Sequence, residues 1–405
     1  MTTDFPISRT CPFSPPDEYE RLREQAPLVR ARIARGEVWL VTRHAEAQQV
    51  LSDPTVSTDP ASPGHPMPAM RPDDPSEEEL KIRRRFQAGQ FIDMDPPEHS
   101  LYRRMLIPEF TVRRVKEMRP AIQEATDLLI DDMLKAGSPT DLVDAFGFAL
   151  PSMVTCTLLG VPYADRDFFR ARTRKMMDTG VGSSADGIAA AIEVWHYLDG
   201  LITEAEGEPG DDLIGRLVTA RRETGELTHD ALVGMVFLLL IAGHETTANM
   251  IPLGVHTLLR HPDQLAALRA DPTGWPFAVE ELLRYHSIVD WVGFDRVATR
   301  DMEIGGQAVR AGEGMFVLGA SANRDPRVFD RPDDFDIRRG ARNHLAFGYG
   351  VHQCLGQNLA RAELEIAYRA LFDRLPALHV IGDDADLPFN YDGVVFGTRA
   401  FPVGW

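Results

Sequence analysis

The sequence predicts a mainly α-helical fold with a minor β region. Apolar residues recur at helical spacing through most of residues 112–285, and they do so again after residue 354. Between these stretches, residues 302–318 hold short apolar runs that the tight-turn pair Gly305-Gly306 interrupts. The length of 405 residues alone suggests about two to three domains, but no glycine–serine or proline-rich linker divides the chain convincingly.

The elements follow in order along the chain. The N-terminal third mixes short strands and helices, with a strand at 38–42, a helix at 44–51 and a long surface loop over 52–75. Helices are predicted at 112–135, 146–159, 165–177, 185–205, 213–222 and 275–285. Thr228 is expected to cap a long helix that ends near residue 260, before Pro262. Short strands follow at 302–304 and within 309–318, and a last helix begins after Cys354.

Composition excludes several classes of protein. The net charge of −18 argues against a nucleic-acid binder, which needs a basic surface. Three cysteines lie far apart without the spacing of a disulfide framework, as expected in a reducing cytosol. The N-terminus shows neither a signal peptide nor an anchor helix, and the longest apolar run, 233–243, is shorter than the ~20 residues that cross a bilayer. We therefore expect a soluble, cytoplasmic protein that binds no membrane.

The most informative segment is FGYGVHQCLGQNLAR, at residues 347–361. It places one cysteine, Cys354, in a turn bracketed by Gly348, Gly350 and Gly356, directly before a predicted helix. Free N–H groups at a helix start favour a negative charge, so a thiolate held there is suited to ligate a metal. The alternative is that Cys354 is a small buried hydrophobe, as most free cysteines are.

A second unusual segment interrupts the long predicted helix. Residues 242–247, AGHETT, bring a glycine, an acid and two hydroxyls into an otherwise apolar stretch. The glycine weakens the helix by about 1 kcal/mol, and buried polar groups need partners. The segment is either a satisfied polar patch, a helix end, or a functional defect in a helix that continues past it.

The cysteine segment resembles the haem-binding loop of the cytochrome P-450 family, FGxGxHxCxG, with every fixed position filled. The resemblance covers nearly the whole chain, so it implies a single domain that spans residues 1–405. It implies a heme b cofactor whose iron is ligated by the thiolate of Cys354. It also assigns Phe347, Gly348, His352 and Gly356 to cofactor binding.

The polar break resembles the oxygen-activation motif of the same family, AGx(D/E)T. By that resemblance, Ala242 and Gly243 border the haem, and Gly243 leaves room for O2. Glu245 and Thr246 are the implied catalytic residues, which deliver protons through water to the oxygen that is activated.

Four donors match the family residues that bind the haem propionates. His99 and Arg103, in DPPEHSLYRR, resemble the HxxxR pair of the family. Arg296 and His352 match the other usual partners. Charge-assisted hydrogen bonds to carboxylates are among the stronger polar contacts, which favours this assignment over ordinary surface residues.

The string Glu281-Leu282-Leu283-Arg284 resembles the ExxR motif of the family. Taken alone it is an ordinary helical ion pair. The resemblance implies a structural lock behind the haem. An arginine upstream of the cysteine segment completes this lock, and Arg339 is the predicted residue.

The resemblance implies a monooxygenase of the soluble actinobacterial branch that serves secondary metabolism and xenobiotic oxidation. Such an enzyme hydroxylates or epoxidises a bulky hydrophobic small molecule (a polyketide or macrolide, a terpenoid, a steroid-like compound or a xenobiotic) with O2 and two external electrons. No dinucleotide fingerprint is present, so the electrons are expected from NAD(P)H through a ferredoxin reductase and a ferredoxin. We expect a monomer. A peroxide-driven peroxygenase and a non-enzymatic haem sensor are the alternatives.

Two surfaces complete the sequence predictions. By the same resemblance, the substrate pocket is expected among mostly apolar residues, which taken alone are more often plain core, at 86–92, 168–197, 238, 239, 242, 288–292, 394 and 395. A docking face for an acidic ferredoxin is expected at two groups of basic residues, namely Arg103, Arg104, Arg113, Arg114, Lys116 and Arg119, and Arg338, Arg339, Arg342 and Arg361.

Overall fold

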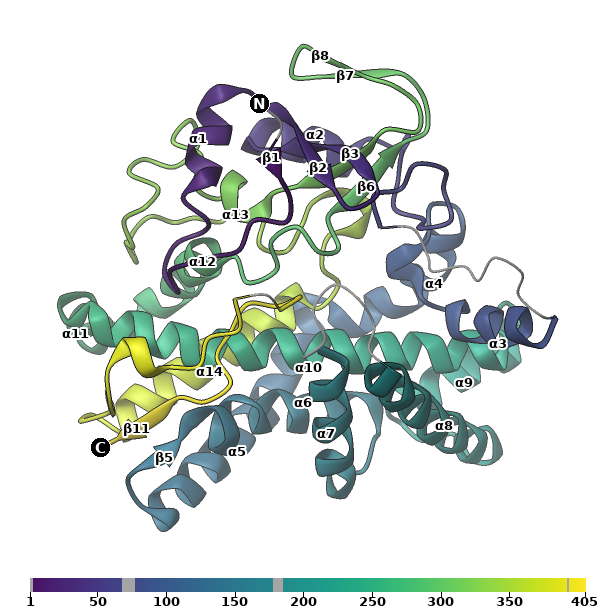
Figure 1. The fold of residues 1–405 in the computed structure, drawn as a ribbon. Coiled ribbons are helices and arrows are strands. Elements are labelled where there is room, and N and C mark those ends of the chain that lie inside the picture. The colour runs from purple at the N-terminus through teal and green to yellow at the C-terminus, as the bar shows by residue number, and fades with distance from the viewer. Residues whose placement is uncertain (1–2, 68–76, 178–184, 392) are drawn as a thin grey trace.

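A computed structural model describes residues 3–67, 77–177, 185–391 and 393–405. Figure 1 shows a large helical half around α10 and a smaller half in which most strands lie with the N-terminal helices. The prediction of a mainly α-helical fold with a minor β region is confirmed. Parts of two predicted segments, 68–75 of the long loop and 178–184 of the pocket region, lie outside the described residues.

The α-helices are α1 (Glu18–Gln25), α2 (His44–Ser52), α3 (Glu77–Gln87), α4 (Glu98–Leu106), α5 (Val112–Ala136), α6 (Ala149–Leu159), α7 (Arg166–Met177), α8 (Ala185–Gly207), α9 (Leu213–Thr224), α10 (His229–Arg260), α11 (Pro262–Ala270), α12 (Trp275–His286), α13 (Gly319–Ala322) and α14 (Gln357–Arg374). Short helical turns are η1 (Phe91–Asp93), η2 (Ile107–Phe110), η3 (Val143–Gly147), η4 (Tyr163–Asp165), η5 (Pro272–Gly274), η6 (Gly350–His352) and η7 (Asp384–Asp386). The strands are β1 (Thr3–Asp4), β2 (Leu28–Ile33), β3 (Gly36–Val41), β4 (Val56–Ser57), β5 (Thr140–Asp141), β6 (Asp295–Ala298), β7 (Met302–Ile304), β8 (Gln307–Val309), β9 (Gly314–Val317), β10 (His379–Val380) and β11 (Pro402–Gly404).

The long central helix α10 begins and ends where its local sequence predicts. The Thr228 side chain accepts a hydrogen bond from the N–H of Ala231 at 3.1 Å, which satisfies one free donor of the first turn. Pro262 cannot continue the hydrogen-bond ladder of α10, and it instead opens α11 in the first-turn position that proline tolerates. The polar segment at 242–247 lies inside this continuous helix, so it is not a helix end.

Within the described part of the chain, α10 is the helix that by length and composition alone could cross a bilayer. However, 61% of its most apolar 18-residue stretch is buried inside the protein. The helices α3, α6, α8 and α14 pack against it, and its apolar character is that of a core helix.

Two neighbours of α10 show how local signals and packing combine. The N-terminus of α5 is capped by Thr111, whose side chain accepts a hydrogen bond from Arg114 N, and Gly137 (φ +86°) ends the helix one residue after the predicted range 112–135. The helix predicted at 146–159 instead begins as the π turn η3 and becomes α6 at Ala149. A Cβ on Gly147 would lie 3.3 Å from the carbonyl oxygen of Ala248, so this turn packs closely on α10.

The main sheet joins distant parts of the chain in the order β1-β2-β3-β9-β6-β4. The strands β2 and β3 form an antiparallel hairpin, with Leu28 opposite Val41. β3 pairs in parallel with β9, which pairs antiparallel with β6. This arrangement fixes β6, which carries Arg296 opposite Met315 of β9.

Candidate functional site

Cys354 lies in a tight turn between η6 and α14. Its own N–H donates to the carbonyl oxygen of Phe347 at 2.8 Å, which closes the turn. Gly348 (φ +68°) and Gly350 (φ +73°) adopt the left-handed conformation that favours glycine. A Cβ on Gly350 would lie only 2.2 Å from the carbonyl oxygen of Leu51, so a side chain at this position cannot fit. The glycines of the sequence motif therefore shape the turn and let it pack against α2.

The Cys354 thiol lies deep in the protein and yet remains accessible, in contrast to the buried Cys156. Burial raises the pKa of Cys354, and the N–H groups of Gly356 and Gln357 oppose that rise. The guanidinium groups of Arg103 and Arg361 also lower the pKa of Cys354, although less than burial raises it. A metal cation at the sulfur adds the missing stabilisation of the thiolate.

His99, Arg103, Arg296 and His352, here called the donor group, come together beside this turn. The rings of His99 and His352 have their centroids 4.3 Å apart. Arg103 on α4 donates through Nη2 to the carbonyl oxygen of Gln353, the residue before the cysteine. The charge of Arg296 acts on His352. All four predicted propionate partners therefore come together at the cysteine turn.

The donor group has unused hydrogen-bonding capacity. His99 is 2% exposed, and neither of its ring nitrogens has a hydrogen-bond partner. Burial lowers the pKa of His99 to about 4, and burial together with the charge of Arg296 lowers the pKa of His352 to about 3. A buried N–H without a partner costs about 1–3 kcal/mol, so the site lacks an acceptor. The donor group and the accessible thiol thus fit a haem, with a sulfur ligand for the iron and donors for the propionates.

The surroundings of Arg296 hold groups that the sequence did not reveal. Arg296 is 3% exposed, and its Nη1 donates to the hydroxyl of Thr58 at 3.2 Å and to the carbonyl oxygen of Asp295 at 2.8 Å. Burial, reinforced by Asp295 and Asp59, raises the pKa of Asp93 to about 6. These residues come from the segment around β4, from η1 and from β6, and no spacing in the sequence connects them.

On α10, the predicted oxygen-activation residues differ in their exposure to solvent. Ala242 and Gly243 are exposed in a helix whose other residues are largely buried, so they border an open space. The Thr246 hydroxyl donates to the carbonyl oxygen of Ala242 at 2.9 Å. The Nδ2 of Asn249 donates to the carbonyl oxygen of Glu245 at 2.9 Å and lies 3.4 Å from its Oε1.

The neighbouring His244 belongs to the opposite face of α10. It is 1% exposed and packs edge-on against Phe148, with ring centroids 4.3 Å apart. A Cβ on Gly243 would approach the Thr155 hydroxyl to 3.3 Å, so the glycine also allows α6 to pack closely. Because α10 packs on α14, the motif lies on the helix that adjoins the cysteine segment.

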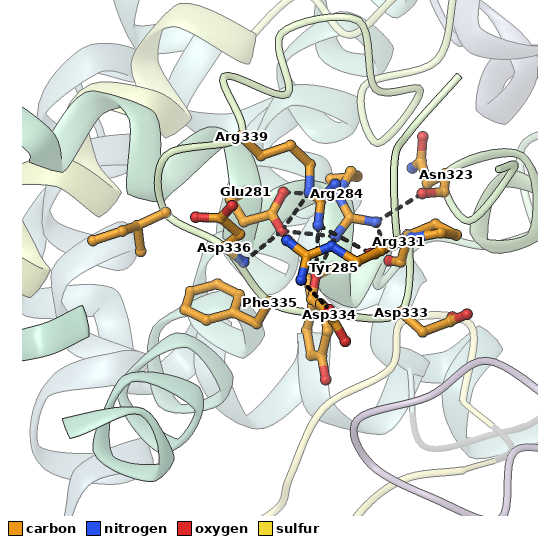
Figure 2. A network of polar contacts seen from close by, with 12 residues as sticks. Glu281, Arg284, Tyr285, Asn323, Arg331, Asp333, Asp334, Phe335, Asp336 and Arg339 are labelled. Atoms are coloured by element: carbon orange, nitrogen blue, oxygen red, sulfur yellow. Dashed lines mark hydrogen bonds and ion pairs between the residues drawn. The ribbon is translucent and has the colours of Figure 1, made fainter. Parts of the chain in front are cut away.

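Figure 2 shows the ion-pair network around Glu281 and Arg284, which are both fully buried. Arg284 donates to both carboxylate oxygens of Glu281 at 2.7 Å and to the carbonyl oxygens of Asn323 and Pro332. Arg339 donates from Nε to Glu281 at 3.0 Å, so the predicted third member is confirmed. The network joins α12 to residues 323–339, and its central pair of Glu281 and Arg284 is closed to solvent, which makes it a device of the fold.

We expect Glu281→Gln to destabilise the protein strongly, because it leaves the buried guanidinium of Arg284 without a counter-charge. Breaking a buried pair in this way costs about 3–5 kcal/mol of unfolding free energy. Urea unfolding of the holoenzyme measures this loss. The control is Glu18→Gln, which breaks the exposed pair with Arg21 and should cost under about 1 kcal/mol. Equal losses in the two variants would contradict the role of Glu281.

Comparisons with known proteins agree with this geometry. The sequence profile described as Cytochrome P-450 matches residues 200–272 and 277–394. Vitamin D3 dihydroxylase from Streptomyces griseolus is 46% identical over 410 aligned residues, which cover 100% of this chain and 98% of the relative. The 20-oxo-5-O-mycaminosyltylactone 23-monooxygenase from Streptomyces fradiae is 44% identical over 403 residues, which cover 99% of this chain and 92% of the relative.

Solved structures extend the likeness to three dimensions. The crystal structure of mycinamicin VIII C21 methyl hydroxylase MycCI from Micromonospora griseorubida, bound to mycinamicin VIII, matches with a TM-score of 0.91. The two sequences are 40% identical, and the match covers 100% of both chains. With its cysteine turn, its donor group and these full-length relatives, the chain belongs to the cytochrome P-450 family.

Proposed function

We propose that this haem-thiolate monooxygenase hydroxylates or epoxidises a bulky, apolar small molecule in secondary metabolism. The observation that carries the proposal is the accessible Cys354 thiol beside a donor group whose His99 nitrogens have no partner. When bound through Cys354, haem supplies the oxidising chemistry from O2 and two electrons, and the thiolate favours O–O cleavage. The side chains and backbone of this chain perform the remaining tasks, which are to bind the haem, to leave room for O2 and substrate, and to deliver protons.

The proposed division of labour follows from position. Cys354 ligates the iron, Phe347, Gly348 and Gly356 shape the turn, and His352 belongs to the donor group beside it. With His99, Arg103 and Arg296, it holds the two propionates by hydrogen bonds and charge. Ala242 and Gly243 line the open space on α10, where their small size leaves room for O2 and substrate.

Thr246 and Glu245 are proposed to manage protons. The hydroxyl of Thr246 donates its hydrogen to the carbonyl oxygen of Ala242. The hydroxyl oxygen of Thr246 can therefore accept a hydrogen bond from a water molecule and hold that water in place. Glu245, half-buried and within reach of Asn249, supplies the exchangeable proton. A positioned acid and an ordered water deliver protons to one oxygen atom without opening the site to bulk solvent.

The proposed substrate class rests on pocket chemistry and on the relatives. The predicted pocket residues Leu238 and Leu239 are partly buried and apolar, as is Phe86, whose ring lies 4.6 Å from Trp195. The names of the relatives refer to vitamin D3, a mycaminosyl macrolide and a mycinamicin. These names favour a substrate of steroid or macrolide size over a small polar one.

A panel of macrolides, steroids, terpenoids and small polar compounds tests the proposal. We expect the apolar, bulky compounds to shift the Soret band on binding, and a bound compound to be oxidised with NADPH, ferredoxin reductase and ferredoxin. Binding by the small polar compounds alone would reject the substrate class. Turnover with peroxide but not with ferredoxin would identify a peroxygenase, and the absence of turnover under both conditions would favour a sensor.

An acidic ferredoxin is the proposed electron donor, with a smaller docking surface than the sequence predicted. Arg361 pairs with Glu280 and Arg339 with Glu281, so both belong to internal networks. Arg114 and Arg119 are also paired, with Glu109 and Glu365 respectively. Among the described residues, exposed Lys116 and Arg342 have no acidic partner. The exposed apolar residue Val112 lies on α5 with Lys116, and the exposed apolar residues Tyr349 and Val351 lie at η6, next to the cysteine turn. A cytoplasmic location and a monomeric state complete the proposal.

We expect Lys116→Glu combined with Arg342→Glu to slow ferredoxin-driven turnover and to flatten its dependence on salt. The reason is that charges at the rim of a docking site mainly raise the rate of association, and salt screens them. Stopped-flow reduction across a range of ionic strength measures both effects. Peroxide-driven turnover should not change, and neither should turnover of the control Arg300→Glu, which lies before β7. Equal slowing of both routes would show that Lys116 and Arg342 serve structure instead.

A further inference from the structure

Glu280 forms a second buried ion-pair cluster beside the Glu281 network. It precedes Glu281 on α12, so its side chain leaves the helix in a different direction, and it is 5% exposed. Its Oε1 accepts from Nε of Arg361 at 2.7 Å, and its Oε2 accepts from Nη2 of Arg361 at 3.1 Å. Oε2 also receives the Nε2 hydrogen of His344 at 3.0 Å. One carboxylate therefore connects α12 to two segments that flank the cysteine turn.

The hydrogen bonds of His344 define its state. Its Nδ1 accepts from the N–H of Ala346 at 3.1 Å, so the ring hydrogen lies on Nε2 and points to Glu280. Burial lowers the pKa of His344, which keeps it neutral at pH 7. Burial alone would raise the pKa of Glu280, but the bonds from His344 and Arg361 bring it down to about 2. The cluster thus holds one negative and one positive charge.

Arg361 carries the influence of Glu280 to the cysteine. Its guanidinium lies over the ring of Phe347, 4.5 Å from the centroid. The carbonyl oxygen of Phe347 accepts the hydrogen bond from the N–H of Cys354 that closes the turn. Arg361 is also close enough for its charge to act on the sulfur of Cys354. The salt bridge to Glu280 compensates the positive charge of the Arg361 guanidinium.

We propose that Glu280 is a positioning residue for the thiolate, which anchors both flanks of the cysteine turn and cancels the charge of Arg361 near the sulfur. The proposal rests on the ligation of haem iron by Cys354. It assigns to Glu280 a task different from that of Glu281, whose partners Arg284 and Arg339 donate to backbone carbonyl oxygens between residues 323 and 334 (Figure 2).

Charge cancellation predicts opposite effects for the two partners. Glu280→Gln leaves the positive charge of Arg361 uncompensated, which stabilises the reduced, more negative iron site and raises its reduction potential. Arg361→Gln leaves the negative charge of Glu280 uncompensated and lowers the potential. The double variant removes both charges and should return close to the wild-type potential. A merely structural role would move the two single variants in the same direction.

The experiment is spectroelectrochemical titration of the holoenzyme at pH 8, with the absorption spectrum of the reduced carbonyl complex recorded for every variant. The matched control is Glu365→Gln. Glu365 lies on α14, as Arg361 does, but it faces α5, where it accepts two hydrogen bonds from Arg119. The substitution breaks this pair. We expect it to leave the potential unchanged. Where Glu280→Gln does not fold, Arg361→Gln alone still tests the proposal by the sign of its shift.

The outcomes separate the two levels of inference. Opposite shifts with recovery in the double variant support the role of Glu280. Shifts of equal sign, no shift in either variant, or the same shift in Glu365→Gln would overturn that role while the thiolate spectrum stays intact. A wild-type protein without the thiolate spectrum would instead overturn ligation by Cys354.

Discussion

Replacing Cys354 by histidine is expected to abolish monooxygenase activity and to move the Soret band of the reduced carbonyl complex to the position of a histidine-ligated haem. The thiolate supplies the electron density that favours O–O cleavage, and neutral imidazole supplies less. Gly348 and Gly350 adopt the left-handed backbone conformation that shapes the turn around Cys354, and neither glycine is changed in this variant. This is the largest effect that we expect from any single substitution.

The other cysteines provide the control for this result. Cys156 is buried on α6, where it interacts with Ser152 and Asp165, and burial raises its pKa to about 11. Cys11 lies in the N-terminal segment, near Arg9 and Tyr391. Cys156→Ser and Cys11→Ser should both keep the thiolate spectrum. If Cys354→Ala kept it as well, one of these two would be the ligand and our assignment would be wrong.

Thr246→Ala is expected to retain haem and substrate binding but to divert electrons from product into hydrogen peroxide. The substitution removes the hydroxyl that donates to Ala242 and offers its oxygen to water. General acid–base assistance is typically worth about 10²–10⁴-fold, so the rate of product formation should fall within that range. Product and peroxide formed per NADPH consumed measure the effect directly.

Thr246→Ser is the matched variant, since it keeps a hydroxyl at the same position and removes only a methyl group. It should keep most of the coupling between NADPH use and product. Unchanged coupling in Thr246→Ala would refute proton management by Thr246, and equal uncoupling in both variants would indicate that packing of the methyl group matters instead.

The sequence predicted those parts of the fold whose causes are local. The ends of α10 follow from Thr228 and Pro262, because caps and breakers act within one turn of their own position, whereas the cap that Thr111 provides for α5 was not predicted. A strand at 38–42 was predicted, but its hairpin partner β2 was missed. The pairing of β3 with β9 could not be foreseen, since a strand partner far along the chain leaves no local mark.

The site shows the same division between motif and surroundings. The motifs placed Cys354, His99 and Arg103, and the structure brings these residues together beside the cysteine turn. The roles of Thr58 and Glu280 were not apparent, because their contacts cross between elements and match no spacing. Sequence also overestimated the exposed basic surface, since a list of arginines does not reveal which ones are turned inward to carboxylates.

The contact between Gly350 and Leu51 has a consequence for how the protein is made. Ribosomes add about 5–20 residues per second, so the 405 residues require roughly 20–80 s. For most of that time, α2 and α4 lie outside the ribosome before the cysteine turn has been made. Leu51 on α2 and His99 on α4 then lack the contacts that this turn provides. The complete haem site therefore forms only after the turn around Cys354 has been synthesised. We therefore expect chains that lack haem to keep the unsatisfied His99 nitrogens and to be more susceptible to proteolysis than chains that hold it.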